Sequence, residues 1–182
     1  MDLRNRRRLQ AGLIVTIFVL PIVVMLGMTW TGWVPHGRSY GKRIQPERDL
    51  TGMPVRLADG KPFIFANRDA VWTLVALPGP DCAGNCLRQL DMTHRAQVSL
   101  GQHADKLRLL YLGAPPESAS AKGFEQIWTL ATTPSNTLDD LRAGARDSVS
   151  AVLVTPTGMA LTHYAANFDP TGLREDLNKV VH

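Results

Sequence analysis

The first apolar stretch of the chain is a continuous run and not a periodic one. Residues 11–33 carry no charged side chain, and the charge-free gap extends from Arg8 to Arg38. As a helix this run would be about 34 Å long, which is enough for the ~30 Å hydrocarbon core of a bilayer. Trp30 and Trp33 lie at its far end, where aromatic side chains gather at membrane interfaces. The pattern predicts a transmembrane anchor. A cleaved signal peptide is disfavoured, because the run is too long and no A-x-A-like site follows it.

Arginines before this run predict its orientation, because positive residues stay on the cytoplasmic side. We therefore expect a cytoplasmic basic tail over residues 1–10, the anchor over residues 11–33 and an exported domain over residues 51–182. Residues 34–50 are rich in Pro, Gly and charge, which is typical of a linker.

Residues 51–182 alternate between short apolar runs and helical periodicity. Buried strands are predicted at 71–77, 107–112, 150–155 and 159–165. A hairpin is predicted around the Asp-Gly turn between residues 55–57 and 63–65. Helices are predicted after Cys82 to about residue 101, and at 124–130, 138–145 and 170–181, the last with Asp169 as its N-cap. The order β-α-β-α-β-β-α predicts an α/β, thioredoxin-like fold with one N-terminal transmembrane helix.

Charge and cysteine content exclude several classes of protein. The net charge of +4 comes mostly from the arginine tail, and the remainder of the chain is nearly neutral. A nearly neutral surface attracts nucleic acid weakly, so we expect no nucleic-acid partner. The two cysteines exclude a disulfide-rich mini-protein and a zinc site built from four cysteines.

The candidate chemistry lies in PGPDCAGNC, between the first long strand and its helix. A helix N-terminus stabilises a thiolate, so Cys82 is expected to be the more reactive cysteine, and Asp81 is expected to cap the helix. The i, i+4 spacing places Cys82 and Cys86 on one side of the first turn. The pair can therefore form a reversible disulfide, bind a soft metal ion such as copper(I) or zinc, or serve only as a structural pair.

A metal site needs further ligands, and the candidates are His94, His103, His163 and Asp147. His94 lies about three turns below Cys82, so it points to the wrong end of the helix. His103 lies in a loop at the opposite pole, whereas His163 lies on a strand and can face either way.

The anchor, the linker, WTLVALPGPDCAGNC and the terminal hairpin and helix together resemble the Sco/SenC family. The segments GRSYGKRI, LADGKPFIFA and NFDPTGLREDLNKVV are still more similar to the short transmembrane proteins of proteobacterial cytochrome oxidase gene clusters. The resemblance implies a single-pass protein of the bacterial inner membrane with a periplasmic thioredoxin-like domain. It also implies a role in cytochrome c oxidase assembly. The implied partners are the lipid bilayer and either the oxidase subunit that carries the copper centre or other assembly factors.

The same resemblance implies copper as cofactor, held by two cysteines and one distal histidine. Cys82 and Cys86 match the cysteines, but Ala83 replaces the usual proline and Asp147 stands where the histidine is expected. Asp147 and Ser148 also stand where thioredoxin carries a cis-proline. We therefore expect the pair to bind copper(I), with His163 or Asp147 as possible third ligand, and to hold copper(II) poorly.

These patterns are compatible with three functions. The leading one is an accessory factor in cytochrome c oxidase biogenesis that acts on copper-site assembly through Cys82 and Cys86, by thiol chemistry or by docking. The second is a membrane-tethered thiol–disulfide reductase of broader range. The third is a non-catalytic scaffold, because a fold alone does not fix a function.

Overall fold

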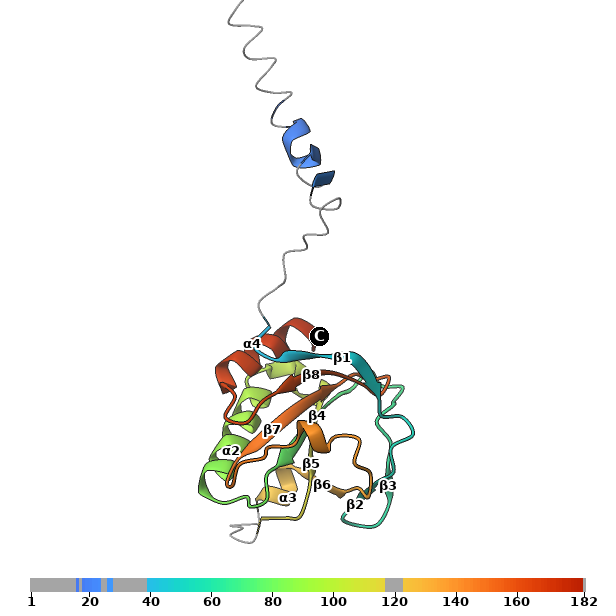
Figure 1. Ribbon diagram of the computed structural model, residues 1–182, viewed down its shortest axis with the longest axis vertical. Helices are drawn as coiled ribbons and strands as arrows, with labels where there is room; N and C mark the ends of the chain where they lie inside the picture. Colours follow the sequence, from blue (N-terminus) through green and yellow to red (C-terminus); the bar gives the residue numbers. More distant parts are fainter. Residues whose placement is uncertain (1–15, 17, 24–25, 28–38, 117–122, 182) are drawn as a thin grey trace, which may run out of the picture. The chain divides into compact units, whose positions relative to one another are not determined.

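The computed structural model describes residues 16, 18–23, 26–27, 39–116 and 123–181, which fall into the units Met1–Arg38 and Ser39–His182 (Figure 1). The described residues of the first unit are helical. Among all the described residues, none belongs to a helix that is both long enough and apolar enough to cross a bilayer. The predicted basic tail and much of the predicted anchor lie outside the described residues, so the anchor stays a prediction.

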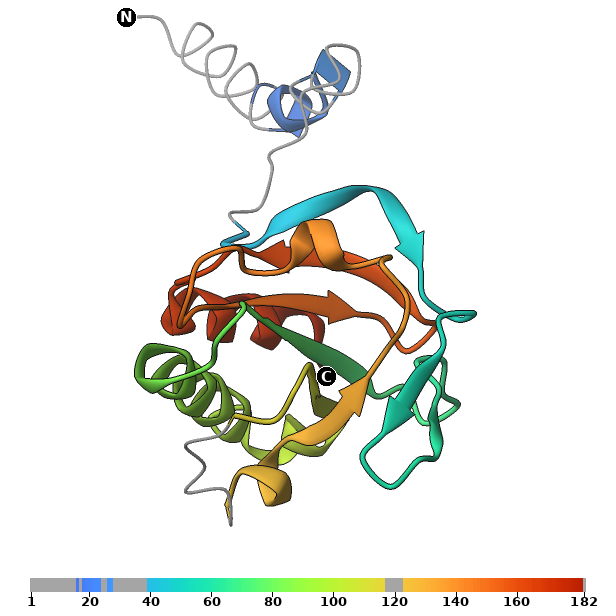
Figure 2. The same cartoon turned by 60° about the horizontal axis from the view of Figure 1, so that its bottom comes forward.

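The second unit is built on one mixed sheet, in which β4 and β5 are parallel while β7 runs antiparallel to β4 and β8 (Figures 1 and 2). The four strands predicted at the centre are confirmed as β4, β5, β7 and β8, which gives the thioredoxin-like α/β fold. The spatial order is β1-β8-β7-β4-β5-β6-β2-β3. The strand bounds are β1 Lys42–Asp49, β2 Val55–Leu57, β3 Pro62–Phe63, β4 Trp72–Pro78, β5 Leu107–Leu112, β6 Thr129–Thr132, β7 Val149–Val154 and β8 Met159–Tyr164.

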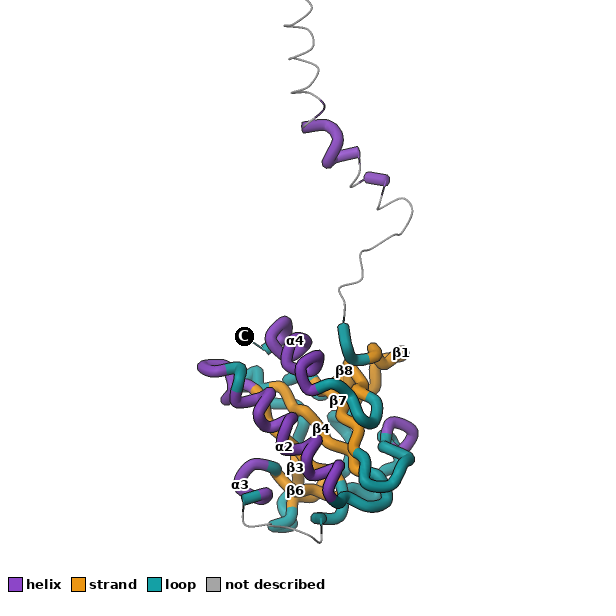
Figure 3. Tube along the Cα trace, turned by 90° about the vertical axis from the view of Figure 1, so that its left-hand side faces the viewer, coloured by secondary structure: helices purple, strands orange, loops and turns teal. Residues whose placement is uncertain are grey.

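Alternate residues of β4 enter two separate cores, which is why this strand is apolar throughout. Leu74 and Ala76 pack with the helices α2 (Gly84–Val98) and α4 (Pro170–Val180), which lie on the same face of the sheet (Figure 3). Val75 and Leu77 face the opposite core. Because β4 is buried on both faces, its carboxyl end is held in place, and the cysteine segment begins directly after it.

Helix α4 begins as the sequence predicts. The Asp169 carboxylate accepts hydrogen bonds from the backbone N–H groups of Thr171 and Gly172, and Pro170 occupies the first turn. This cap satisfies two amides that the helix itself leaves unpaired.

The helices predicted at 124–130 and 138–145, between β5 and β7, differ from the structure. α3 spans only Phe124–Ile127, because the backbone of Ala131 pairs with both β5 and β2 and draws Thr129–Thr132 into the sheet as β6. In place of a helix at 138–145 there is a short 3-10 turn, η2, at Asp139–Leu141. Sheet pairing has overridden local helix preference at Thr129–Thr132, whereas η2 ends because the backbone is extended at Arg142. The predicted hairpin is confirmed by the pairing of Val55 with Phe63, although β3 ends at Phe63.

The prediction of a linker at residues 34–50 also differs from the structure over its second half. Lys42–Asp49 form the edge strand β1, which pairs with β8, so the folded unit begins at Ser39 and not at residue 51. The pattern KRIQPERD gave no sign of a strand, because on an edge strand most side chains face water and Pro46 is tolerated. Ile44 is the residue of this strand that enters the core.

Candidate functional site

Cys82 and Cys86 form a disulfide directly after β4, with their Cα atoms 5.1 Å apart. The two sulfurs differ in surroundings: Cys82 is half-buried, whereas Cys86 is fully buried in the core under α2. The accessible cysteine therefore precedes the helix and the protected one lies in its first turn.

The cap of this helix differs from the sequence expectation. α2 begins at Gly84 with Ala83 as N-cap residue, and neither the Ala83 side chain nor Asp81 caps it. The exposed Asp81 pairs instead with Arg146, with its Oδ2 3.2 Å from the arginine Nε. The sequence-based assignment of Asp81 was wrong, because the segment between Asp81 and the helix extends two residues further before it coils.

Asp147, which lies 61 residues after Cys86 in the sequence, caps the helix instead. Its carboxylate accepts hydrogen bonds from the N–H groups of Ala83 at 2.9 Å, Asn85 at 2.9 Å and Cys86 at 3.0 Å. The bonds from Cys86 and Asn85, followed by that from Ala83 and the nearby charge of Arg88, hold the pKa of Asp147 below its usual value. Asp147 is thus an ionised acceptor whose oxygens already serve the first turn of α2.

The loop that carries Asp147 fits closely against the segment before Cys82. The Gly79 N–H donates to the Ser148 carbonyl at 2.9 Å, and the Asp147 N–H donates to the Asp81 carbonyl at 3.1 Å. A Cβ atom on Gly79 would collide with the carbonyl oxygen of Ala145. Asp147 itself has a left-handed backbone with φ of 49°. These contacts fix where the carboxylate lies.

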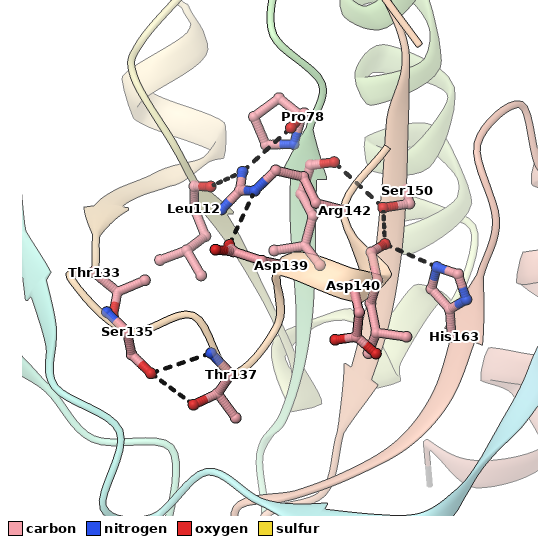
Figure 4. A network of polar contacts seen from close by, with 12 residues as sticks. Pro78, Leu112, Thr133, Ser135, Thr137, Asp139, Asp140, Arg142, Ser150 and His163 are labelled. Carbon is pink, nitrogen blue, oxygen red and sulfur yellow. Dashed lines mark hydrogen bonds and ion pairs between the residues drawn. The ribbon is translucent and has the colours of Figure 1, made fainter. Parts of the chain in front are cut away.

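A groove of about 660 Å³ opens beside Cys82. Arg142 forms part of its wall and donates from Nη1 to the carbonyls of Pro78 at 3.2 Å and Leu112 at 3.0 Å (Figure 4). Tyr111 also lines the groove, and no hydrogen bond joins its buried hydroxyl to any of the residues that the structure describes. Burial raises the pKa of Tyr111 to about 12. The groove therefore opens beside the half-buried Cys82 and is lined by neutral or paired groups.

The donor atoms of the described residues do not form a copper site with three ligands. His163 places its Nε2 3.0 Å from the Leu141 carbonyl, which also accepts a hydrogen bond from the Ser150 hydroxyl (Figure 4). Burial lowers the pKa of His163 below its usual value. His103 contacts the Gln102 side chain in the 3-10 turn η1 (Gly101–Lys106). Within residues 39–116 and 123–181, no three His, Cys, Asp or Glu side chains are grouped to hold a metal ion.

Sequence reasoning located the cysteine pair but missed the groups that surround it. The roles of Gly79, Arg142 and Asp147 depend on contacts across the sheet, which no local pattern records. The signal in the sequence is Asp147 itself, at the position where the Sco/SenC pattern has a histidine.

Comparison with known proteins places this architecture among thioredoxin-like folds. BsSco, a member of the Sco family of cytochrome c oxidase assembly proteins in which a disulfide switch was identified, is 16% identical, with a TM-score of 0.51 over 77% of this chain and 97% of that one. A thioredoxin-like protein from Porphyromonas gingivalis is 11% identical, with a TM-score of 0.52 over 71% and 89%. Copper-bound ScoI from Arabidopsis thaliana is 15% identical, with a TM-score of 0.49 over 79% and 98%.

Likenesses at these identities show the fold and nothing finer. A search of curated proteins found no match. The family described as "Transmembrane-like, thioredoxin-like, C-terminal domain" matches residues 72–182, which include β4, both cysteines, Asp147 and α4. The chain belongs to this family of transmembrane-like, thioredoxin-like C-terminal domains.

Proposed function

We propose that this protein is a thiol–disulfide exchange factor in which Cys82 is the attacking sulfur and Cys86 the resolving one. The observation that carries the proposal is the unequal burial of the pair: Cys82 is half-buried beside a groove, and Cys86 is fully buried behind it. Exchange needs one sulfur that a partner can reach and a second that the partner cannot. A merely structural disulfide has no need of this asymmetry.

The reaction transfers two electrons from the reduced pair to a partner disulfide. The Cys82 thiolate attacks one partner sulfur, the partner S–S bond breaks, and the released partner thiolate takes up a proton. The Cys86 thiolate then attacks the Cys82 sulfur, which releases the second partner thiol and restores the Cys82–Cys86 disulfide. An external dithiol reductant must reduce the pair again before the next turnover.

We place this chemistry at a membrane and in cytochrome c oxidase assembly. The family description and the charge-free run at residues 11–33 support a tethered domain. The likeness to BsSco and the resemblance of the cysteine segment to Sco/SenC proteins support the oxidase subunit with the copper centre as substrate. A periplasmic reductase of broader range uses the same two sulfurs and differs only in its partners.

Trapping with matched serine variants tests the exchange step. The full-length protein in detergent is incubated with glutathione disulfide, and mixed disulfides are counted by mass. Cys86→Ser should accumulate one glutathione on Cys82, because the resolving thiol is missing. Cys82→Ser should accumulate far less, because Cys86 is buried. Equal modification of both variants, or of neither, would overturn the proposal and favour a structural disulfide or a scaffold.

A second arm tests the substrate. The Cys86→Ser protein is mixed with the oxidised copper-centre subunit of cytochrome c oxidase and with an unrelated disulfide protein of similar size. Preferential capture of the oxidase subunit supports a role in its assembly. Equal capture of both proteins would contradict that role and favour the reductase of broader range.

A further inference from the structure

We infer that Asp147 is a positioning residue that lowers the reduction potential of the Cys82–Cys86 pair. Its carboxylate occupies the helix amides that would otherwise stabilise a thiolate. The inference rests on the proposed exchange function and assigns this carboxylate a role in setting the redox poise.

The geometry of the helix N-terminus supports this role. The early N–H groups of a helix have no partner within it and carry a partial positive charge. In α2 the Asp147 carboxylate accepts three of these N–H groups, from Ala83, Asn85 and Cys86. Two of the three belong to the residue directly after Cys82 and to Cys86 itself. The donors nearest the reactive sulfurs are therefore already occupied.

The charge of Asp147 acts in the same direction. Asp147 stays ionised, because these hydrogen bonds hold its pKa below the usual range. A fixed negative charge at this position repels a second negative charge, so it disfavours the thiolate of either cysteine. Less stabilisation of the reduced pair means that the disulfide is favoured and that the reduced protein gives up its electrons more readily.

The neighbouring charges do not offset this effect at the helix amides. Asp81 pairs with Arg146, and Asp139 lies 3.7 Å from the guanidinium of Arg142, so these four groups largely balance one another. Arg88 attracts Asp147 from one turn further along α2. The titratable and charged groups that line the groove with Cys82 are Asp81, Tyr111, Asp139 and Arg142. Arg146 pairs with Asp81, and Arg88 acts on Asp147.

The test compares full-length wild type with Asp147→Asn. The substitution removes the charge, keeps an oxygen acceptor and tolerates the positive φ of 49°. At pH 8 we expect the dithiol–disulfide equilibrium to shift about tenfold towards the dithiol, which corresponds to a potential about 30 mV less negative. The pH midpoint for alkylation of reduced Cys82 should fall. At pH 5.5, where neither protein forms much thiolate, the two potentials should converge.

Controls separate this role from a purely structural one. Asp91→Asn removes an exposed charge from the same helix, at a residue that pairs with Arg95 and does not line the groove, and its potential should match the wild type. Asp147→Ala frees all three amides and should shift the potential at least as far as Asp147→Asn. An Asp147→Asn shift that is the same at pH 5.5 and pH 8, or no shift at either pH, would overturn the inference.

The alkylation midpoint also separates this inference from the proposed function. A lowered midpoint in Asp147→Asn, together with no glutathione adduct on Cys86→Ser, would keep the role of Asp147 and reject exchange. An adduct on Cys86→Ser with an unchanged midpoint would do the reverse.

Discussion

Single residues fix the distance between the disulfide and the loop that faces it. Asp147 ties the loop to the first turn of α2, and Gly79 lets the two backbones approach. A substitution at either residue changes one contact between these two segments and leaves the sheet intact.

Replacing Asp147 by histidine should create the ligand that the site lacks. The loop lies beside both cysteines, since its carboxylate reaches the Cys86 amide, so an imidazole there can join two thiolates on one metal ion. We expect Asp147→His, reduced and then loaded with copper(II), to show a strong sulfur-to-copper charge-transfer absorption, and the wild type to show little. A strong band in the wild type would reveal a ligand that the described side chains do not supply. The absence of a band in both proteins would contradict the prediction.

Adding one methyl group at Gly79 should loosen the whole site. A Cβ there collides with the Ala145 carbonyl, whereas a Cβ at Gly144, in the same loop, has open space around it. We expect Gly79→Ala to lower the free energy of unfolding by about 2 kcal/mol, as overpacked positions do, and Gly144→Ala to change it little. Urea unfolding of both variants measures the difference. Equal stability of the two would show that the loop is free to move away.

At the scale of elements, a second carboxylate holds the start of the folded unit. Asp176 of α4 is buried and accepts hydrogen bonds from the Ser39 hydroxyl at 3.0 Å and from the N–H groups of Tyr40 at 2.8 Å and Gly41 at 3.1 Å. A Cβ on Gly172 would collide with the Tyr40 ring, so α4 and this short segment are in close contact. Hydrogen bonds to Asp176 therefore hold residues 39–41, which lead into β1, against α4.

The pH dependence of stability should report this contact. Burial alone raises the pKa of Asp176, but hydrogen bonds from Gly41, Lys179, Ser39 and Tyr40 outweigh it and hold this pKa below its usual value. A carboxyl with a lowered folded pKa stabilises the protein above its unfolded pKa and loses that contribution as the pH falls through the folded value.

We therefore expect Asp176→Asn to cost about 1–3 kcal/mol at pH 7, and the difference from wild type to shrink below about pH 4. Asp91→Asn is the matched control, because Asp91 forms an exposed pair with Arg95 and its replacement should cost little at any pH. A difference for Asp176→Asn that does not change with pH would contradict the role of its charge.

Much of the element order could be predicted, and the reason lies in local signals. The strands β4 and β7 are continuous apolar runs, and Asp169-Pro170 is a local helix start, so each can be recognised within a few residues. β1 and β6 depend on partners more than 20 residues away: Arg43 pairs with Thr162, and Ala131 with Leu57. The cap by Asp147 is of the same kind, which is why the cysteines could be found from the sequence and their electrostatic setting could not.

At the scale of the whole molecule, the family assignment and the proposed tether lead to a prediction of topology. The arginines of residues 1–10 should remain in the cytoplasm and His182 should lie in the periplasm, because basic residues resist translocation. A reporter enzyme that is active only in the periplasm, fused after His182, should be active. Replacing Arg4, Arg6, Arg7 and Arg8 by acidic residues is the matched control and should reduce its activity. A stable but inactive fusion of the natural sequence would contradict the proposed orientation.

The reversibility of the Cys82–Cys86 bond is the central claim, and a redox titration of the full-length protein tests it most directly. Free thiols are quantified after equilibration in dithiothreitol buffers of graded potential at pH 7, with circular dichroism recorded at each point. We predict a single reversible two-electron transition above about −300 mV, the range of exchangeable disulfides, with the fold retained in the reduced protein. A pair that stays oxidised well below that potential, or a protein that unfolds when it is reduced, would show that the disulfide is structural and contradict the account.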